Sequence, residues 1–260
     1  MEVNEIKTNN NEFGFEVKGT DTAFMNTLRR MVIDEVPTMA IEWVEFRKND
    51  SVLYDEILAH RLGLIPLKTD LKAYTVPEKC TCKGEGCAKC QVLITLKTKA
   101  SGIIDSDKLK SKDPAVIPVY DKIPITHLEG NQELDLIATA KLGRGKHHAK
   151  WSPAHSWFVQ EANITVNNKS PKFEKFKNKF PAAIFDDSGK IDKNKIDSQE
   201  LIDACEGVCD EIIKVDYNDN NFVMFIESWG QLSPKEIIEA SVSELLLKID
   251  EFRTLVNKLD

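Results

Sequence analysis

The C-terminal part of the chain carries an apolar seam that constrains the fold more than any other feature. Its residues alternate spacings of four and three over three heptads: Ile238, Val242, Leu245, Ile249, Phe252, Val256 and Leu259. This period is typical of a helix that packs along one stripe. Ser233 and Glu236 form a capping box before it, and Pro234 occupies the first helical position. The sequence therefore predicts a long helix whose apolar face something else must cover.

The first fifty residues are predicted to form a hairpin, a helix and a strand. Residues 13–18 alternate apolar and other side chains, as half-buried strands do, and the asparagines at 9–11 supply a turn. One amphipathic helix is expected from about Thr22 to Glu35, stopped by Pro37. Its apolar face comprises Phe24, Leu28, Met31 and Val32.

The middle of the chain is predicted to be β-rich up to about Val166, because β-branched and aromatic runs alternate with turn residues. A change in composition marks a small inserted module at about 167–221, in which Ser198–Val215 is expected to be helical. A strand buried on both faces is expected at Phe222–Ile226. The other predicted strands are Ile41–Phe46, Val92–Leu96, Leu134–Ala140 and Trp157–Val166.

Composition excludes several classes of function. A chain of 260 residues with 42% hydrophobic and 30% charged residues can bury a core. Its 35 Lys and Arg against 42 Asp and Glu give a net charge of −7, which is the wrong sign for gripping a phosphate backbone, so no direct sequence-specific DNA binding is expected. There is no apolar run of membrane-spanning length and no signal peptide pattern at the start, so we expect a cytoplasmic protein without a membrane contact.

Four of the six cysteines lie within eleven residues and predict a structural metal site. They are Cys80, Cys82, Cys87 and Cys90. Zinc needs four thiolates in a tetrahedron, and Gly84 and Gly86 give the chain the freedom to fold back on itself. Free or oxidised thiols and an iron–sulfur cluster are the alternatives, and structural zinc, one per chain, is the favoured interpretation.

The remaining titratable residues do not predict catalysis. Cys205 and Cys209 stand four apart on the expected helix, where a redox-sensitive pair or half of a shared metal site is less favoured than small buried core residues. Histidines and carboxylates such as Asp55 and His60 lack an accompanying nucleophile signature.

Four segments spread over nearly the whole chain carry a family resemblance. They are Asn26–Pro37, Asp55–Leu67, Lys141–Pro153 and Glu227–Gly230. In this order they resemble the D subunit of archaeal DNA-directed RNA polymerase, a family related to the bacterial alpha subunit and the third-largest eukaryotic subunit.

The resemblance implies an α+β fold in three parts. Residues 1–40 and 221–260 would form a discontinuous alpha-like dimerisation domain, and residues 41–166 a β-rich insert domain that carries the zinc loop at 80–90. Residues 167–220 would form a small degenerate ferredoxin-like module. This module holds a cluster in many archaeal members, but here only Cys205 and Cys209 are present, so no iron–sulfur cluster is expected.

The resemblance also implies partners. The dimerisation domain would pair with the small subunit L, and Arg29 and Arg30 match paired arginines that meet the second-largest subunit; small zinc-containing subunits would join the same platform. The expected partner-binding residues are Phe24, Leu28, Arg29, Arg30, Met31, Ile238, Val242, Leu245, Ile249, Phe252 and Val256. A basic, glycine-containing loop offers further inter-subunit contacts through Lys146, His148, Lys150 and Trp151.

The predicted function is therefore that of a scaffold subunit of RNA polymerase in transcription, without catalytic residues of its own. The alternative is an iron–sulfur redox or sensor protein, which an absorbance spectrum would distinguish. A metal-dependent hydrolase is a third hypothesis, but it needs an open coordination position that four cysteines do not leave.

Overall fold

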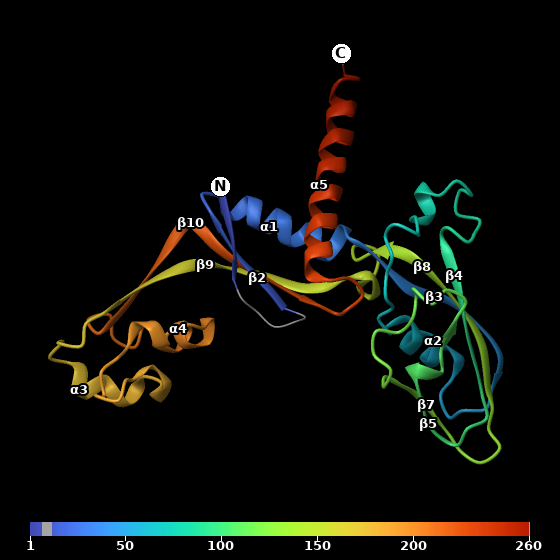
Figure 1. The fold of residues 1–260 in the computed structure, drawn as a ribbon, viewed down its shortest axis with the longest axis horizontal. Coiled ribbons are helices and arrows are strands. Elements are labelled where there is room, and N and C mark those ends of the chain that lie inside the picture. Colours follow the sequence, from blue (N-terminus) through green and yellow to red (C-terminus); the bar gives the residue numbers. More distant parts are fainter. Residues whose placement is uncertain (7–11, 260) are drawn as a thin grey trace. The chain divides into compact units, whose positions relative to one another are not determined.

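The computed structural model describes residues 1–6 and 12–259, so the turn expected at 9–11 lies outside the described residues. The chain forms two compact units, whose elements are labelled in Figure 1. One unit contains Met1–Glu5, Phe15–Met25 and Phe158–Met224. The other contains Asn26–Trp157, Phe225–Asp260 and the segment Ile6–Gly14, as far as these are described.

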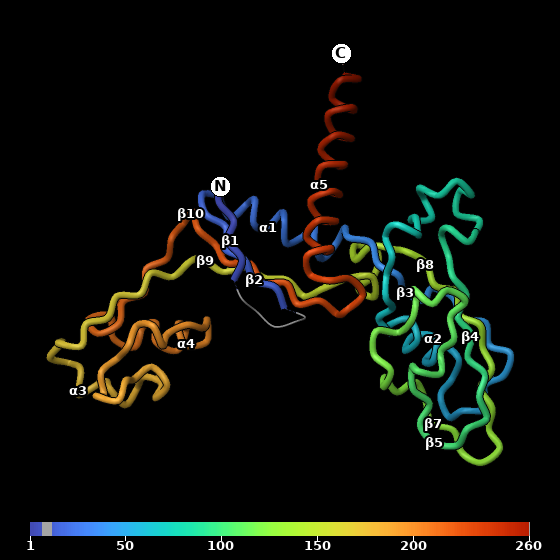
Figure 2. Tube along the Cα trace, in the orientation of Figure 1, coloured from blue at the N-terminus to red at the C-terminus, as the bar shows by residue number. Residues whose placement is uncertain are grey.

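The larger unit is built on an antiparallel sheet in the order β3-β8-β4-β6. Figure 2 labels β3, β4 and β8 along the Cα trace. All three strands predicted in this region are confirmed, and each extends beyond its predicted bounds. Ile41 of β3 pairs with Ala140 of β8, so residues of matching burial face one core. The four strands are β3 (Pro37–Asn49), β8 (Leu134–Arg144), β4 (Gln91–Thr98) and β6 (Lys110–Ser111).

Smaller elements close the core of this unit. Helix α2 (Asp55–Gly63) buries Leu58 and Leu62 against the sheet. Strands β5 (Gly102–Asp105) and β7 (Pro124–Leu128) form a separate two-stranded sheet. Short 3-10 turns occupy Pro77–Lys79, Ser106–Lys108 and Ala149–Trp151. The expected mixed α and β fold with a β-rich insert is confirmed.

The helix predicted near the N-terminus is present but changes geometry along its length. It begins as α1 (Thr22–Arg30) and continues as a π-helical segment (Met31–Glu35). Its buried stripe runs through Met25, Leu28 and Val32, whereas Phe24 is 38% exposed. The predicted face is therefore rotated by one residue at its start, because spacings of three and four fit Met25 as well as Phe24.

The predicted C-terminal helix is confirmed as α5 (Pro234–Val256), and Leu259 lies beyond its end. The capping box is complete: the Ser233 hydroxyl accepts a hydrogen bond from the Glu236 amide, and the Glu236 carboxylate accepts one from the Ser233 amide at 2.9 Å. Each partner satisfies a backbone donor that the first helical turn leaves free.

A second four-stranded sheet has the order β1-β2-β10-β9. Its strands are β1 (Glu2–Ile6), β2 (Glu12–Lys18), β10 (Ile213–Ser228) and β9 (Ala154–Val166). The strand expected at Phe222–Ile226 is the end of β10, but its burial on both faces is wrong. Phe222, Met224 and Ile226 are buried, while the two residues between them are only half-buried.

The small module consists of short helices around a core of its own. Helices α3 (Phe173–Phe176) and α4 (Gln199–Cys205) are joined by 3-10 turns at Lys177–Lys179, Ala182–Ile184 and Lys193–Lys195. The prediction of helix from Ser198 to Val215 is wrong in its second half. Glu206 adopts an extended conformation and Gly207 has φ +70°, a left-handed value that terminates the helix.

Candidate metal centre and partner surfaces

The cysteine loop lies between the turn at Pro77–Lys79 and strand β4. Two tight turns bring the cysteines together, with the Lys83 amide donating to the Cys80 carbonyl at 2.9 Å and the Cys90 amide to the Cys87 carbonyl at 3.0 Å. Gly84 and Gly86 have φ values of +87° and +94°, a region that favours glycine. The predicted role of both glycines in the reversal of the chain agrees with these values.

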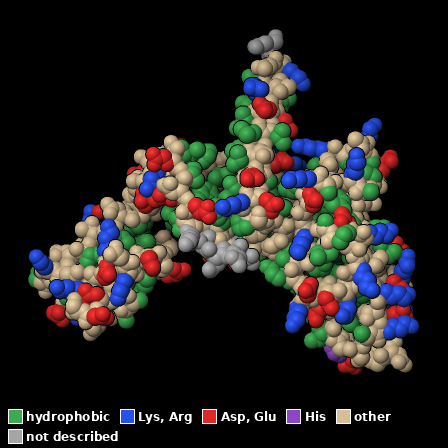
Figure 3. Space-filling view, in the orientation of Figure 1, with side chains coloured by type: hydrophobic (Ala, Val, Ile, Leu, Met, Phe, Trp, Pro, Cys, Tyr) green, Lys and Arg blue, Asp and Glu red, His purple; other side chains and the backbone are tan. Residues whose placement is uncertain are grey.

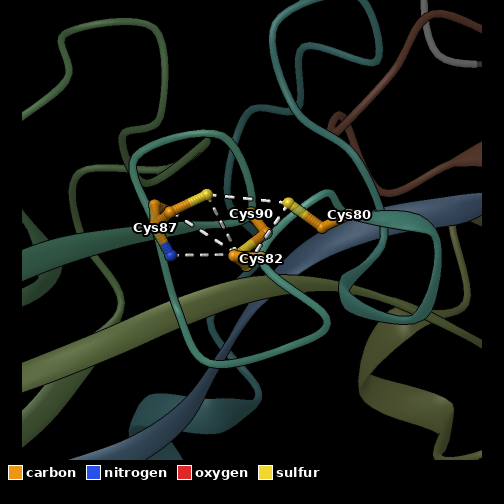
Figure 4. Close-up of side chains that lie close together, drawn as sticks. All are labelled: Cys80, Cys82, Cys87 and Cys90. Carbon is orange, nitrogen blue, oxygen red and sulfur yellow. Dashed lines mark hydrogen bonds between the residues drawn. The ribbon is translucent and has the colours of Figure 1, made fainter.

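The four sulfur atoms are arranged as a single metal ion requires. They lie within 4.8 Å of one another and point into one space (Figure 4). The Sγ atom of Cys82 is 3.5 Å from the Sγ atom of Cys80 and 3.5 Å from that of Cys90. A tetrahedron with zinc–sulfur bonds of about 2.3 Å has edges of about 3.8 Å, close to these separations. The arrangement therefore fits one ion held by four thiolates.

The loop also favours a thiolate at one of these positions. Backbone hydrogen bonding from Gly86, followed by the hydrogen bond with Cys80, lowers the pKa of the Cys82 thiol to about 6. Burial raises the pKa of the Cys90 thiol to about 12, and a bound cation would favour its thiolate form.

Residues of α5 up to Lys248 anchor the helix within its own unit. Ile237 and Ser241 are fully buried. Lys248 approaches Glu35 at 3.0 Å, and Arg144 approaches Glu244 at the same distance. Burial opposes ionisation of Glu35, but the hydrogen bonds and charges of Lys248 and Lys146 outweigh it and lower the pKa of Glu35.

From Val242 onward, α5 exposes most of the predicted seam and further apolar residues. Ile249 and Phe252 are 54% and 68% exposed, and Val242 and Val256 are exposed as well. Ile238 and Leu245 are half-buried. Figure 3 shows hydrophobic side chains along this helix. The seam pattern missed Leu246, Leu247 and Leu255, which are also exposed and widen the apolar surface beyond a single stripe.

The partner-binding residues expected on the N-terminal helix divide into two groups. Leu28 and Met31 are buried in the chain itself, whereas Phe24 and Arg30 are exposed. The Arg29 side chain donates to the Asn26 side-chain oxygen at 2.9 Å, and Arg30 approaches Asp34 at 3.5 Å. A partner can therefore reach Phe24 and the arginines, but not Leu28 or Met31 in this conformation.

Two residues of the expected inter-subunit loop face inward. Trp151 is buried, and its indole N–H donates to the Lys141 carbonyl at 3.3 Å. The Lys150 ammonium lies 4.4 Å from the centroid of the Trp151 ring and pairs with Glu42. Lys146 and His148 remain exposed. Lys150 and Trp151 therefore fasten the loop to its own unit.

Gly145 is enclosed so closely by this unit that a larger residue does not fit. A Cβ atom at Gly145 would lie 2.0 Å from the backbone oxygen of Ile33. We expect Gly145→Ala to lower the free energy of unfolding by about 1–3 kcal/mol, since backbone has to move. Gly63→Ala is the control, because its Cβ meets only ordinary contacts and alanine suits a helix. Denaturant unfolding of both variants measures the difference, and equal stability would contradict the prediction.

Cys205 and Cys209 do not share a helix, because α4 ends at Cys205. Cys205 is fully buried in the core of the module, and burial raises the pKa of its thiol. Cys209 packs against the same core. Among the described residues, the loop cysteines are the only group of three or more potential ligands that could hold a metal ion.

Comparisons with known proteins decide the family. The Rpb3/RpoA insert domain of RNA polymerase matches residues 44–158. The Rpo3 subunit of DNA-directed RNA polymerase from Methanosphaera stadtmanae is 36% identical, with 94% of each chain covered. The Rpo3 subunits from Methanosarcina acetivorans and Pyrococcus horikoshii are 34% and 32% identical over all of this chain and 99% of their own. The chain belongs to the Rpo3 family of RNA polymerase subunits. The family predicted from the four sequence segments is thereby confirmed.

Because it belongs to the Rpo3 family, the chain is a subunit of DNA-directed RNA polymerase and acts in transcription. Its partners are other polymerase subunits. None of the helices within residues 1–6 and 12–259 is long and apolar enough to cross a membrane.

Proposed function

We propose that this chain is a noncatalytic assembly subunit that pairs with the small subunit L in the cytoplasm and so forms the platform for the large catalytic subunits. The exposed apolar half of α5 carries the proposal. Ile249 and Phe252, together with Leu246 and Leu255, are all more than half exposed on one helix, and large apolar side chains exposed together mark an interaction surface. A partner helix laid along this surface would cover it.

The domain assignment belongs to the same proposal. The two ends of the chain, 1–40 and 221–260, make the pairing domain, while 41–166 and 167–220 form the insert domain and the ferredoxin-like module. Arg29 and Arg30 face the second-largest subunit, and small zinc-containing subunits join the platform. The exposure of Phe24 and Arg30 supports a contact there.

Zinc is the ion that we propose for the cysteine loop. Four thiolates leave no open position, so the ion stabilises the loop and takes no part in chemistry. Sulfur separations of 3.5 to 3.8 Å support one ion, since a cluster spreads its ligands over several irons. The buried position of Cys205 gives no support to the alternative of an iron–sulfur redox or sensor protein.

Co-expression tests the pairing. We expect this chain made alone to self-associate, since its apolar helix is open, and the same chain made with subunit L to give a soluble equimolar complex. Light scattering coupled to size exclusion measures both states. The proposed function would be contradicted if this chain made alone were a well-behaved monomer and did not bind subunit L.

A further inference from the structure

Three cations converge on Glu35, which ends the π-helical segment after α1. The Lys248 ammonium of α5 lies 3.0 Å from this carboxylate, and Lys146 and Arg144 approach it at 3.5 Å and 3.7 Å. The Glu35 side chain is only 12% exposed, so solvent screens these pairs less than it screens pairs on the open surface. Arg144 also approaches Glu244 of α5 at 3.0 Å. Two positions of α5, one helical turn apart, are therefore tied by charge to the rest of the unit.

The parts of this network outside α5 are fixed to one another by their backbones. The Lys146 amide donates to the Asp34 carbonyl at 3.0 Å. Gly145 lies so close to the Ile33 carbonyl that a Cβ atom would not fit between them. The segment that carries Glu35 is π-helical, a geometry that is rare and is frequently found at functional sites. Because this side of the network is held in place, α5 is the part that the Glu35 charge can position.

The apolar part of α5 lies beyond this anchor. Every residue of Ile249–Leu259 is exposed, and none of them forms a hydrogen bond or ion pair with another element within the described part of the chain. Ile237 and Ser241 are buried and hold the start of the helix. From Ser241 to Phe252 the helix rises about 16 Å, so a tilt of about 10° about Ser241 would displace Phe252 by about 3 Å. A displacement of this size would remove apolar contacts, which require heavy atoms within about 4.5 Å.

Without the Glu35 charge, repulsion would replace attraction at this anchor. Lys248 would then lie near Lys146 and Arg144 without the carboxylate that now joins all three. Glu244 pairs with Arg144 and so offsets one of the three positive charges. Like charges at such short range repel, and α5 is the element that is free to move away.

We propose that Glu35 is a positioning residue for subunit pairing, which holds Lys248 and so fixes the direction in which the exposed part of α5 meets its partner. A surface that already has its bound orientation loses less conformational freedom on association. The inference rests on the proposed function, because it assigns a residue outside the apolar seam to the pairing that the seam carries out.

The substitution Glu35→Gln tests the proposal, since it removes the charge and keeps the size of the side chain. We expect the affinity for subunit L, measured by titration of the labelled subunit, to fall roughly tenfold. The loss should shrink at about 1 M salt, because screening weakens the ion pairs of the wild-type chain and leaves its apolar contacts. Glu45→Gln is the matched control. Glu45 is exposed on β3 and forms no ion pair within the described residues, so this variant should bind subunit L like the wild type.

Single-molecule energy transfer measures the orientation of α5 in the free chain, at concentrations too low for self-association. Dyes on unnatural residues at the exposed positions Thr254 of α5 and Lys110 of β6 leave the native cysteines unmodified. We expect Glu35→Gln to shift or broaden the distribution of transfer efficiency. Lys248→Gln should do the same, whereas Lys248→Arg keeps the charge and should retain the wild-type distribution and affinity. Lys248 is 42% exposed, so its substitution leaves the core intact.

The two measurements together decide whether Glu35 acts through α5. Unchanged affinity in Glu35→Gln would overturn the proposal. A loss of affinity with an unchanged transfer distribution would also overturn it, because Glu35 would then contact the partner directly. If the wild-type chain does not bind subunit L, the proposed function is contradicted, and the transfer distribution of the free chain still shows whether Glu35 positions α5.

Discussion

The double substitution Leu245→Asp and Ile249→Asp is expected to abolish pairing with the small subunit. Both side chains lie on the seam of α5, one half-buried and the other 54% exposed. Burying each apolar side chain at an interface contributes roughly 1.5–3 kcal/mol, and an unpaired carboxylate there adds a desolvation cost. The loss of at least about 3 kcal/mol weakens binding 100-fold or more. Titration of labelled subunit L measures it.

A matched control separates the seam from charge alone. Thr254→Asp with Asn257→Asp adds the same two charges to exposed positions near the end of α5, off the seam. We expect this control to bind subunit L with nearly wild-type affinity. In the seam variant the β-rich sheet should remain folded, which its denaturant unfolding reports, because Leu245 and Ile249 are not part of the core cluster. Unchanged pairing in the seam variant would mean that subunit L binds a different surface of this chain.

The sequence was most informative where a residue's role depends on its near neighbours. The capping box at Ser233, the turns at Gly84 and Gly86 and the strands β3, β4 and β8 all follow from short-range patterns, and the structure contains them. The boundary of α4 was missed because Glu206 and Gly207 interrupt an otherwise helical composition. A single glycine is tolerated in many helices, so sequence alone does not decide the point.

Contacts between distant segments were the main source of error. Trp151 and Lys150 look like exposed loop residues, yet they pack against Lys141 and Glu42. Leu28 and Met31 share the apolar character of the partner-binding seam, but the chain buries them itself. Apolar periodicity shows which face is covered and does not show what covers it.

The substitution Cys87→Ser is expected to remove the metal from the cysteine loop. Cys87 Sγ lies 3.6 Å from Cys80 Sγ and 3.8 Å from Cys90 Sγ, so its loss opens one corner of the tetrahedron. Structural zinc in such sites contributes on the order of 10–16 kcal/mol of binding free energy at neutral pH, which a three-thiolate site loses in large part. Elemental analysis should fall from about one zinc per chain to a small fraction of that.

Hydrogen exchange and a second cysteine variant complete the zinc test. Without metal, amides of residues 80–90 should exchange faster, whereas those of β8 should keep their protection, because the sheet core does not include the loop thiols of Cys82 and Cys87. The Cys209→Ser variant, which is changed at the separate core of the small module, should retain the zinc of the cysteine loop. Stoichiometric iron with a visible absorption band, lost on changing Cys205 and Cys209, would contradict the assignment. The Cys87→Ser variant should still pair through α5, because the apolar seam from Ile249 onward is exposed on that helix and includes no residue of the cysteine loop.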